Sequence, residues 1–290
     1  MNNLNKPRFF LSVLLLTVIT ASVFSNLDAS SEFFKVTQSA ISEYLGWFII
    51  LTANGFLIFS TYLIFTKYKD IKLGGNDAKP SYSYTNWVAM LFSAGLGIGL
   101  LFYGVAEPIG NLNDYPEMIS GNLSHNAGKA LSLTNLHWGL HGWAVYSALG
   151  LCFAFASYNK KKAFRVSSLL GTNIENNKPL AAFIDIIAIL TTVAGIATSL
   201  GLGASQINGG LNYVFDIEIN EFIIIVLITI LGLISVCLGL DAGIKRLSQL
   251  NMFLAVSLLL AVLLLGPTIF ILNAMVQNAG VYLNQVIQLS

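Results

Sequence analysis

Seven long runs of apolar residues constrain the fold of this chain more than any other feature of its sequence. Most are close to the roughly 20 residues that an α-helix needs to cross about 30 Å of hydrocarbon. Backbone polar groups inside a bilayer must be bonded within their own segment, which favours helices. The sequence therefore predicts an all-α integral membrane protein. The predicted spans are Phe9–Phe24, Leu45–Phe65, Trp87–Val105, His137–Tyr158, Phe183–Gly203, Phe222–Gly239 and Leu250–Leu272.

The composition agrees with this class and excludes several others. Only 10% of the residues are charged and 55% are hydrophobic, whereas about 25% of residues are charged in a soluble domain. A net charge of +1 without a basic stripe gives no reason to expect a nucleic-acid partner. We find no Ser/His/Asp constellation, phosphate-binding loop or pair of catalytic carboxylates, so we do not expect an enzyme. The first run could be a secretory signal, but we interpret it as a retained span.

The basic residues predict how the chain is oriented in the membrane. Cytoplasmic loops carry an excess of Lys and Arg, and a cytoplasmic N-terminus places all but Lys35 and Lys129 of the 15 basic residues on that side. Seven spans then leave the C-terminus outside, in a multi-pass protein of the inner (plasma) membrane. The residues on the cytoplasmic side are Lys6, Arg8, Lys67, Lys69, Lys72, Lys79, Lys160, Lys161, Lys162, Arg165, Lys178, Lys245 and Arg246.

The third span is unusually rich in glycine. It runs from Met90 to Pro108 and reads MLFSAGLGIGLLFYGVAEP. Glycine inside a helix costs roughly 1 kcal/mol relative to alanine, so Gly95, Gly97 and Gly99 make a weak point. An interrupted membrane helix faces a cavity or packed protein and is typical of binding sites in secondary transporters. Gly95 and Gly99 could equally form a GxxxG contact with a neighbouring helix.

Aromatic residues gather at the start of the fourth span, which opens HWGLHGWAVY. Trp138 and Tyr146 are eight residues apart and so point to roughly one side of a continuous helix. Aromatic faces attract quaternary ammonium groups, at about 0.5 to 2 kcal/mol per contact. On spacing alone, however, an interfacial Trp and a packing Tyr remain the commoner arrangement. His137 and His141 could in principle bind a metal, but no third ligand lies near them in the sequence.

The fifth span contains one acidic residue and several hydroxyl groups. Asp185 lies near its cytoplasmic end, where an ionisable residue is either functional or simply solvated. Thr191, Thr192, Thr198 and Ser199 could offer oxygen ligands to sodium. The commoner fate of such hydroxyls is a hydrogen bond to their own helix.

These motifs together resemble the betaine/carnitine/choline transporter family. The similar segments are FSAGLGIGLLFYGVAEP, HWGLHGWAVYSALGL, TTVAGIATSLGLGASQINGGL and GLDAGIKRLSQLN, in that order along the chain. The resemblance implies two leading helices followed by the first five-helix inverted repeat of a leucine-transporter-type fold. It also implies ion-coupled uptake of a quaternary ammonium compound such as glycine betaine, choline or carnitine, and a possible homotrimer.

The resemblance assigns roles to particular residues. Gly95, Gly97 and Gly99 match the substrate-contacting glycine motif, and Trp138 and Tyr146 match members of an aromatic box. Other residues match positions that bind the coupling ion, sodium or a proton. The backbone around Ser93 and Leu96 matches part of a sodium site, and Thr192 matches one threonine of a second, although Ile196 stands where a further threonine can occur. Gly99 replaces an acidic residue of proton-coupled members, which favours sodium. No organic cofactor or resident metal is implied.

The chain also departs from the family in length. Members have about twelve spans, so we expect residues 1–290 to be a single truncated transmembrane domain. Within it we expect a leading region (1–86), the first repeat (87–272) and a surface tail (273–290). The eighth span, with most of the tryptophan box, is absent. A truncated or split product without transport activity is therefore one alternative. A seven-helix receptor or scaffold is another, against which the orientation and the motifs argue.

Overall fold

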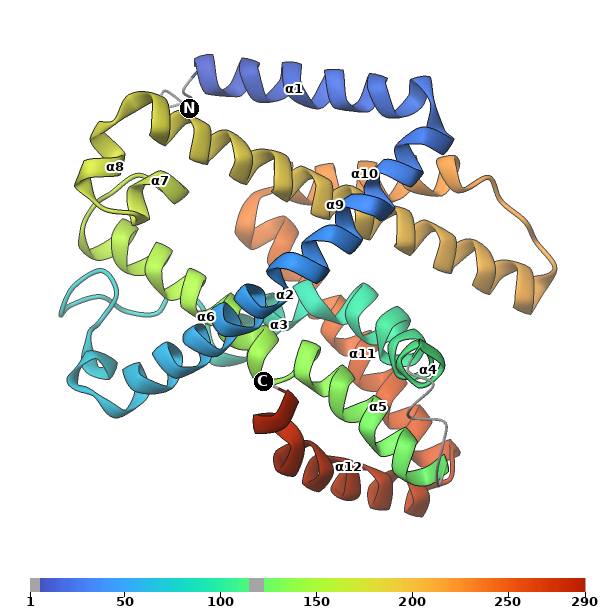
Figure 1. The fold of residues 1–290 in the computed structure, drawn as a ribbon. Helices are drawn as coiled ribbons and strands as arrows, with labels where there is room; N and C mark the ends of the chain where they lie inside the picture. Colours follow the sequence, from blue (N-terminus) through green and yellow to red (C-terminus); the bar gives the residue numbers. More distant parts are fainter. Residues whose placement is uncertain (1–5, 115–122, 290) are drawn as a thin grey trace. The chain divides into compact units, whose positions relative to one another are not determined.

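The computed structural model describes residues 6–114 and 123–289, and every regular element within these ranges is a helix (Figure 1). The all-α prediction is confirmed. The elements in chain order are α1 (Lys6–Ser25), α2 (Leu27–Phe65), the 3-10 helix η1 (Lys67–Asp70), α3 (Tyr84–Gly95), the π-helix η2 (Leu96–Tyr103), α4 (Gly104–Asp114), α5 (Leu123–Trp138), α6 (Leu140–Ala154), the π-helix η4 (Phe155–Asn159), α7 (Val166–Leu169), α8 (Thr172–Asn176), α9 (Lys178–Phe215), α10 (Glu221–Cys237), the π-helix η5 (Leu240–Ile244), α11 (Lys245–Leu265) and α12 (Thr268–Leu289).

The predicted spans coincide with the apolar helices of the structure. Five helical segments are long and apolar enough to cross a membrane, and the bent third span makes a sixth. The predicted sixth span corresponds to α10, which is apolar but has only 17 residues. Each of the seven predicted spans therefore has a helical counterpart, and the membrane class of the protein is confirmed by the length and composition of these helices.

Helix ends outside the apolar runs were harder to predict. α2 begins at Leu27, well before the predicted start of its span at Leu45. The side chain of Asn26 caps it by accepting a hydrogen bond from the Ala29 amide at 3.0 Å, and Asp28 lies in the first turn, where the helix dipole favours a negative charge. Hydropathy detects only the part of a helix that crosses lipid, so polar extensions of this kind escape it.

The predicted end of the seventh span, Leu250–Leu272, is wrong. α11 ends at Leu265, and the chain resumes as α12 at Thr268. Pro267 explains the break, because proline has no N–H to donate and disfavours helical geometry in the preceding residue. Gly266 is accordingly extended, with φ −85° and ψ −171°. The predicted tail helix therefore begins before residue 273.

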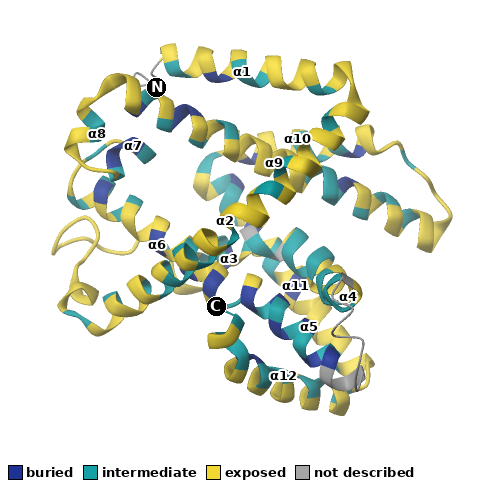
Figure 2. Cartoon of the chain, in the orientation of Figure 1, coloured by how far each residue is buried: buried dark blue, intermediate teal, exposed yellow. Residues whose placement is uncertain are grey.

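The connection between the third and fourth spans is largely helical in the residues that the structure describes. α4 continues to Asp114 and α5 begins at Leu123, while residues 115–122 lie outside the described ranges. α5 packs against both α4 and α12, and buried residues recur at every second position from Asn126 to Leu136 (Figure 2). Because two helices cover α5, it buries residues on more than one face. These contacts fix the part of α5 that precedes Trp138.

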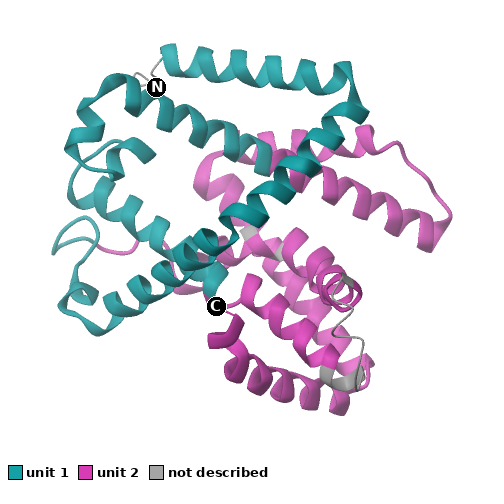
Figure 3. Cartoon of the chain, in the orientation of Figure 1, with its two compact units in different colours: residues 1–78, 141–195, 290 teal, residues 79–140, 196–289 magenta. Residues whose placement is uncertain are grey.

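The chain divides into two compact units, coloured separately in Figure 3. The first unit comprises residues 1–78, 141–195 and 290, and the second comprises residues 79–140 and 196–289. In the first unit, α2 is joined to α6 by polar contacts, including Asn54 Oδ1 with His141 Nε2 at 2.9 Å. In the second unit, α11 packs against α3, and α5 packs against α4 and α12.

Burial in both units is concentrated on small residues. Ala130, Ala148 and Ala204 are buried, as are Ser132 and Ser167, whereas most large aliphatic and aromatic side chains are exposed (Figure 2). Small residues let helix backbones approach closely in membranes, where lipid solvates the large apolar side chains. The pattern is the one expected of helices that present their large apolar side chains to hydrocarbon.

Candidate functional site

The third span changes its winding at the glycine cluster. α-Helical geometry ends at Gly95, the eight residues of η2 follow, and α4 begins at Gly104. The Gly104 amide bonds to the Gly99 carbonyl, five residues earlier, and the two halves of the span are bent by 56°. π-Turns of this kind are frequent at functional sites. The weak point indicated by the glycine spacing is thus a real interruption of the helix.

Trp138 approaches this interruption from α5. A β-carbon built on Gly99 would come within 2.8 Å of Trp138 Cζ3, so only glycine leaves room for the indole in this position. Tyr103, from the end of η2, lies against the same indole with ring centroids 5.5 Å apart and an interplanar angle of 32°. Gly97, by contrast, has open space around it. The close approach at Gly99 is made by the side chain of Trp138.

Glu107 holds the other edge of the indole. Its Oε2 accepts a hydrogen bond from Trp138 Nε1, and its Oε1 pairs with His137 Nδ1. The side chain of Glu107 is 15% exposed, and that of His137 is 52% exposed. The motifs in the sequence assign no role to Glu107. The signal that could have found it is an acidic residue at the very end of an apolar run, where ionisable groups are functional candidates.

Ser93, a residue of the predicted sodium site, is hydrogen-bonded to α11. Asn251 Nδ2 donates to Ser93 Oγ at 3.0 Å and to the Ser93 carbonyl at 3.3 Å. Asn251 thereby donates to a residue two positions before α-helical geometry ends at Gly95. Leu96 begins η2. Asn251 lies in the motif GLDAGIKRLSQLN, but its partner could not be read from the sequence.

A second interruption follows Trp138 directly. α5 ends at Trp138 and α6 begins at Leu140, and a β-carbon on Gly139 would lie 2.3 Å from the carbonyl oxygen of Asn135. Tyr146 lies beyond this break in α6, in the first unit, where its ring is 5.8 Å from that of Trp143. Trp138 belongs to the second unit. A shared aromatic face of Trp138 and Tyr146 therefore stays a prediction.

The hydroxyl of Thr192 is bonded to its own helix. Thr192 Oγ1 donates to the Ala188 carbonyl at 2.7 Å, which is the common arrangement for a threonine within a helix. Thr192 belongs to the first unit and Ser93 to the second. Ser93 and Thr192 are assigned to two different sodium sites, and both assignments stay predictions.

Asp185 is buried rather than solvated. It forms an ion pair with Arg8 and accepts hydrogen bonds from Ser167, from the backbone amide and from Oγ, both at 3.0 Å. These contacts join α1, α7 and α9 within the first unit. Asp185 and Thr192 line the same hollow, whose walls are mainly apolar. The contacts of Asp185 with Arg8 and Ser167 identify it as an anchor between helices.

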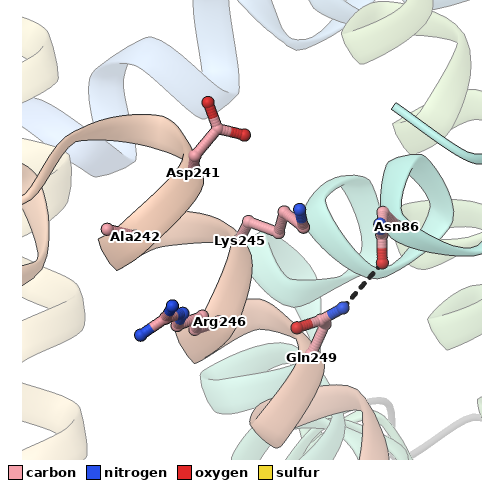
Figure 4. Close-up of a pocket in the computed structure, with 6 residues that line it drawn as sticks. All are labelled: Asn86, Asp241, Ala242, Lys245, Arg246 and Gln249. Atoms are coloured by element: carbon pink, nitrogen blue, oxygen red, sulfur yellow. Dashed lines mark hydrogen bonds between the residues drawn. The ribbon is translucent and has the colours of Figure 1, made fainter. Parts of the chain in front are cut away.

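A polar hollow lies elsewhere in the second unit (Figure 4). Gln249 Nε2 donates to Asn86 Oδ1 at 2.7 Å and so connects α11 to α3. Lys245 extends into the same hollow, with Asp241 above it in the view. None of the predicted site residues lines it. Its lining residues are Asn86, Asp241, Ala242, Lys245, Arg246 and Gln249.

Comparison with known proteins places these features in a family. Residues 7–290 match the family described as BCCT, betaine/carnitine/choline family transporter. The chain is 40% identical over 285 residues to the glycine betaine transporter OpuD of Bacillus subtilis, covering 96% of this chain and 56% of that protein. It is 38% identical to the ectoine/hydroxyectoine transporter of Virgibacillus pantothenticus (99% of this chain, 58% of that protein). It is 36% identical to the high-affinity choline transport protein of Escherichia coli (98% and 42%). The chain spans about half the length of the curated relatives it matches.

Proposed function

Because this chain belongs to the betaine/carnitine/choline transporter family, we propose that it is part of a secondary active transporter for a quaternary ammonium compound. The observation that carries the proposal is the indole of Trp138, held beside the interrupted third span by Gly99 and Glu107. Glycine betaine and choline are named for two relatives. Carnitine carries the same trimethylammonium group, and all three are candidate substrates.

The chemistry of the site suits such a cation. Trp138 is 42% exposed and Tyr146 is 54% exposed, so neither ring is fully covered by the chain itself. A ring face attracts a quaternary ammonium group that cannot donate hydrogen bonds, because its quadrupole is negative above the plane. Gly99 and Tyr103 of η2 lie against the indole of Trp138, which we call the aromatic wall. In secondary transporters, interrupted helices of this kind offer peptide groups to the polar parts of a small substrate.

Coupling to an ion is the second part of the proposal. The backbone around Ser93 and Leu96 is proposed to form part of one sodium site, and Thr192 to contribute to a second. Ion and substrate would together stabilise the closed state more than either does alone, which links their fluxes during alternating access. Gly99→Asp should weaken betaine uptake and alter its ion dependence, with Gly99→Ala as the control for bulk. Unchanged uptake and sodium dependence in Gly99→Asp would contradict this assignment.

A fragment without transport activity of its own is the second candidate. The chain covers 56% of the length of one relative above and 42% of another. A substrate site built by two repeats cannot be enclosed by one. In this case the chain would bind the ligand without transporting it.

Uptake and binding measured together test both candidates. Radiolabelled glycine betaine, choline and carnitine are offered, with and without sodium, to transport-deficient cells that express the chain. The purified chain is titrated with the same compounds. Uptake above the vector control supports the transporter, binding without uptake supports the fragment, and neither uptake nor binding contradicts the proposed function.

The aromatic wall has its own test. Trp138→Ala should weaken binding of trimethylammonium ligands far more than binding of dimethyl analogues, because only the former are permanently charged without a donor hydrogen. Trp87→Ala is the matched control, since Trp87 lies at the start of the third span and outside the site. Equal losses for both ligand types would remove the cation–π explanation.

The location of the protein completes the proposal. We place it in the plasma membrane with a cytoplasmic N-terminus, on the distribution of its basic residues. A reporter fused to the N-terminus or to the C-terminus tests the orientation, because the two fusions should report opposite sides.

A further inference from the structure

We propose that Glu107 is a positioning residue for substrate binding, which sets the orientation of the Trp138 indole over Gly99. The inference rests on the proposed function, because it assumes that the indole face meets the substrate. It adds a residue to which neither the glycine motif nor the aromatic wall assigns a role.

The contacts fix the indole on three sides. Gly99 admits the six-membered edge of the ring, Tyr103 lies against its face, and Glu107 accepts the hydrogen bond of its Nε1–H. Hydrogen bonds to a carboxylate are roughly twice as strong as those between neutral groups. A rotation of the indole about its side-chain torsions would break the bond to Glu107 and press the ring into η2. The carboxylate therefore selects one orientation of the ring.

Glu107 is engaged on both of its oxygens. The second oxygen pairs with His137, the residue before Trp138, so the carboxylate holds two consecutive residues at the end of α5. An ionised carboxylate offers only acceptors, and burial of an unpaired one is costly. With both oxygens matched to donors, Glu107 is suited to orienting Trp138 rather than to binding the substrate cation itself.

The position of Glu107 in the chain strengthens this role. α4 begins at Gly104, directly after the π-helical turn, so Glu107 lies within the first turn of the second half of the broken span. Any movement of this half relative to α5 would pull on the indole. Glu107 thereby connects the interrupted helix to the aromatic wall.

A spectroscopic test examines the contact without any substrate. The chain is labelled with 15N at its tryptophan indoles, and the signal of Trp138 is assigned by its disappearance in Trp138→Phe. Glu107→Gln replaces a charged acceptor by a neutral one, so the indole proton of Trp138 should move upfield. Glu218→Gln is the matched control, because Glu218 is exposed in the loop before α10. An unchanged Trp138 signal in Glu107→Gln would overturn the proposal.

A double-mutant cycle then separates positioning from direct contact with the ligand. Trp138→Phe keeps an aromatic face but removes the N–H that Glu107 holds. In the otherwise unchanged chain, Glu107→Gln should weaken binding of glycine betaine about tenfold, as expected for the loss of a charged hydrogen bond. In the Trp138→Phe background the same substitution should change binding less than twofold. An undiminished loss there would mean that Glu107 acts on the ligand directly, which overturns the proposal.

Two further measurements keep the outcomes distinct. Thermal unfolding of each variant identifies any general loss of folding, and Glu107→Asp should restore part of the affinity if it still reaches the indole. If the unchanged chain binds no quaternary ammonium compound, the proposed function fails, and the indole signal still decides whether Glu107 holds Trp138. If the chain binds but Glu107→Gln binds equally well, only the positioning role fails.

Discussion

The indole of Trp138 lies so close to Gly99 that a β-carbon on this glycine would come within 2.8 Å of Cζ3. Gly99 is therefore required for a close approach as well as for a weak helix. A β-carbon on Gly97, two residues earlier, would meet nothing within 4 Å. The two glycines of one motif consequently make different contributions, and substitution separates them.

Alanine at position 99 should destabilise the protein. The added methyl group must displace an indole that Tyr103 and Glu107 also hold, and overpacking of this kind costs about 1–3 kcal/mol. Gly97→Ala should instead be neutral or stabilising, because it meets open space and alanine favours helix. The midpoint of thermal unfolding in detergent measures both effects. Equal midpoints for the two variants would show that Trp138 does not pack on Gly99.

Removal of the amide of Asn251 should also destabilise the broken span. Asn251→Leu removes both hydrogen bonds to Ser93, to Oγ and to the carbonyl, and a hydrogen bond contributes about 0.5–1.5 kcal/mol net. Ser93→Ala is the milder variant, because it removes only the hydroxyl partner at 3.0 Å and keeps the carbonyl contact. The free energy of unfolding in denaturant titrations should rank the two variants in this order. The reverse order would contradict the contribution of Asn251 as a hydrogen-bond donor to Ser93.

The ion pair of Arg8 and Asp185 should be sensitive to loss of one partner. Asp185→Ala leaves Arg8 without its carboxylate and Ser167 without its acceptor, and breaking a buried pair in this way costs about 3–5 kcal/mol. Asp77→Ala in the exposed linker is the control. The double variant Arg8→Met with Asp185→Leu should regain part of the loss, as judged from unfolding midpoints. No recovery would indicate that the charge pair is not the source of the effect.

Acid should weaken the contacts that Glu175 makes from α8. The hydrogen bond from Lys162 lowers the pKa of Glu175 below its ordinary value of 4.5, with further help from Ser168. Because the pKa is lower in the folded protein, this contact stabilises the fold above the ordinary pKa and is lost as the pH falls through the lowered value. Glu175→Gln should therefore reduce the unfolding midpoint at pH 7 and have little effect at the acid end. Glu43→Gln, on the exposed surface of α2, is the control, and a Glu175→Gln effect that grows toward low pH would contradict this sign.

The class of the protein and the positions of its helices follow from the pattern of apolar residues alone. Apolar runs of this length have only one stable arrangement in a bilayer, because every backbone group must be bonded locally. The glycine cluster likewise marked the interruption of the third span, since helix propensity is a local property. These features need no knowledge of which helices are neighbours.

The pairing of side chains at the candidate site, by contrast, depends on how the helices pack. The contacts of Glu107 with Trp138, and of Asn251 with Ser93, join residues that are 31 and 158 positions apart. Periodicity and propensity cannot reveal such pairs, because each depends on how two helices pack. The same holds for Asp185. Hydropathy is compatible with a solvated carboxylate at this position, but in the structure Asp185 forms a buried ion pair with Arg8, 177 positions away. Local sequence fixes where a helix forms, and only packing determines what its polar residues bind.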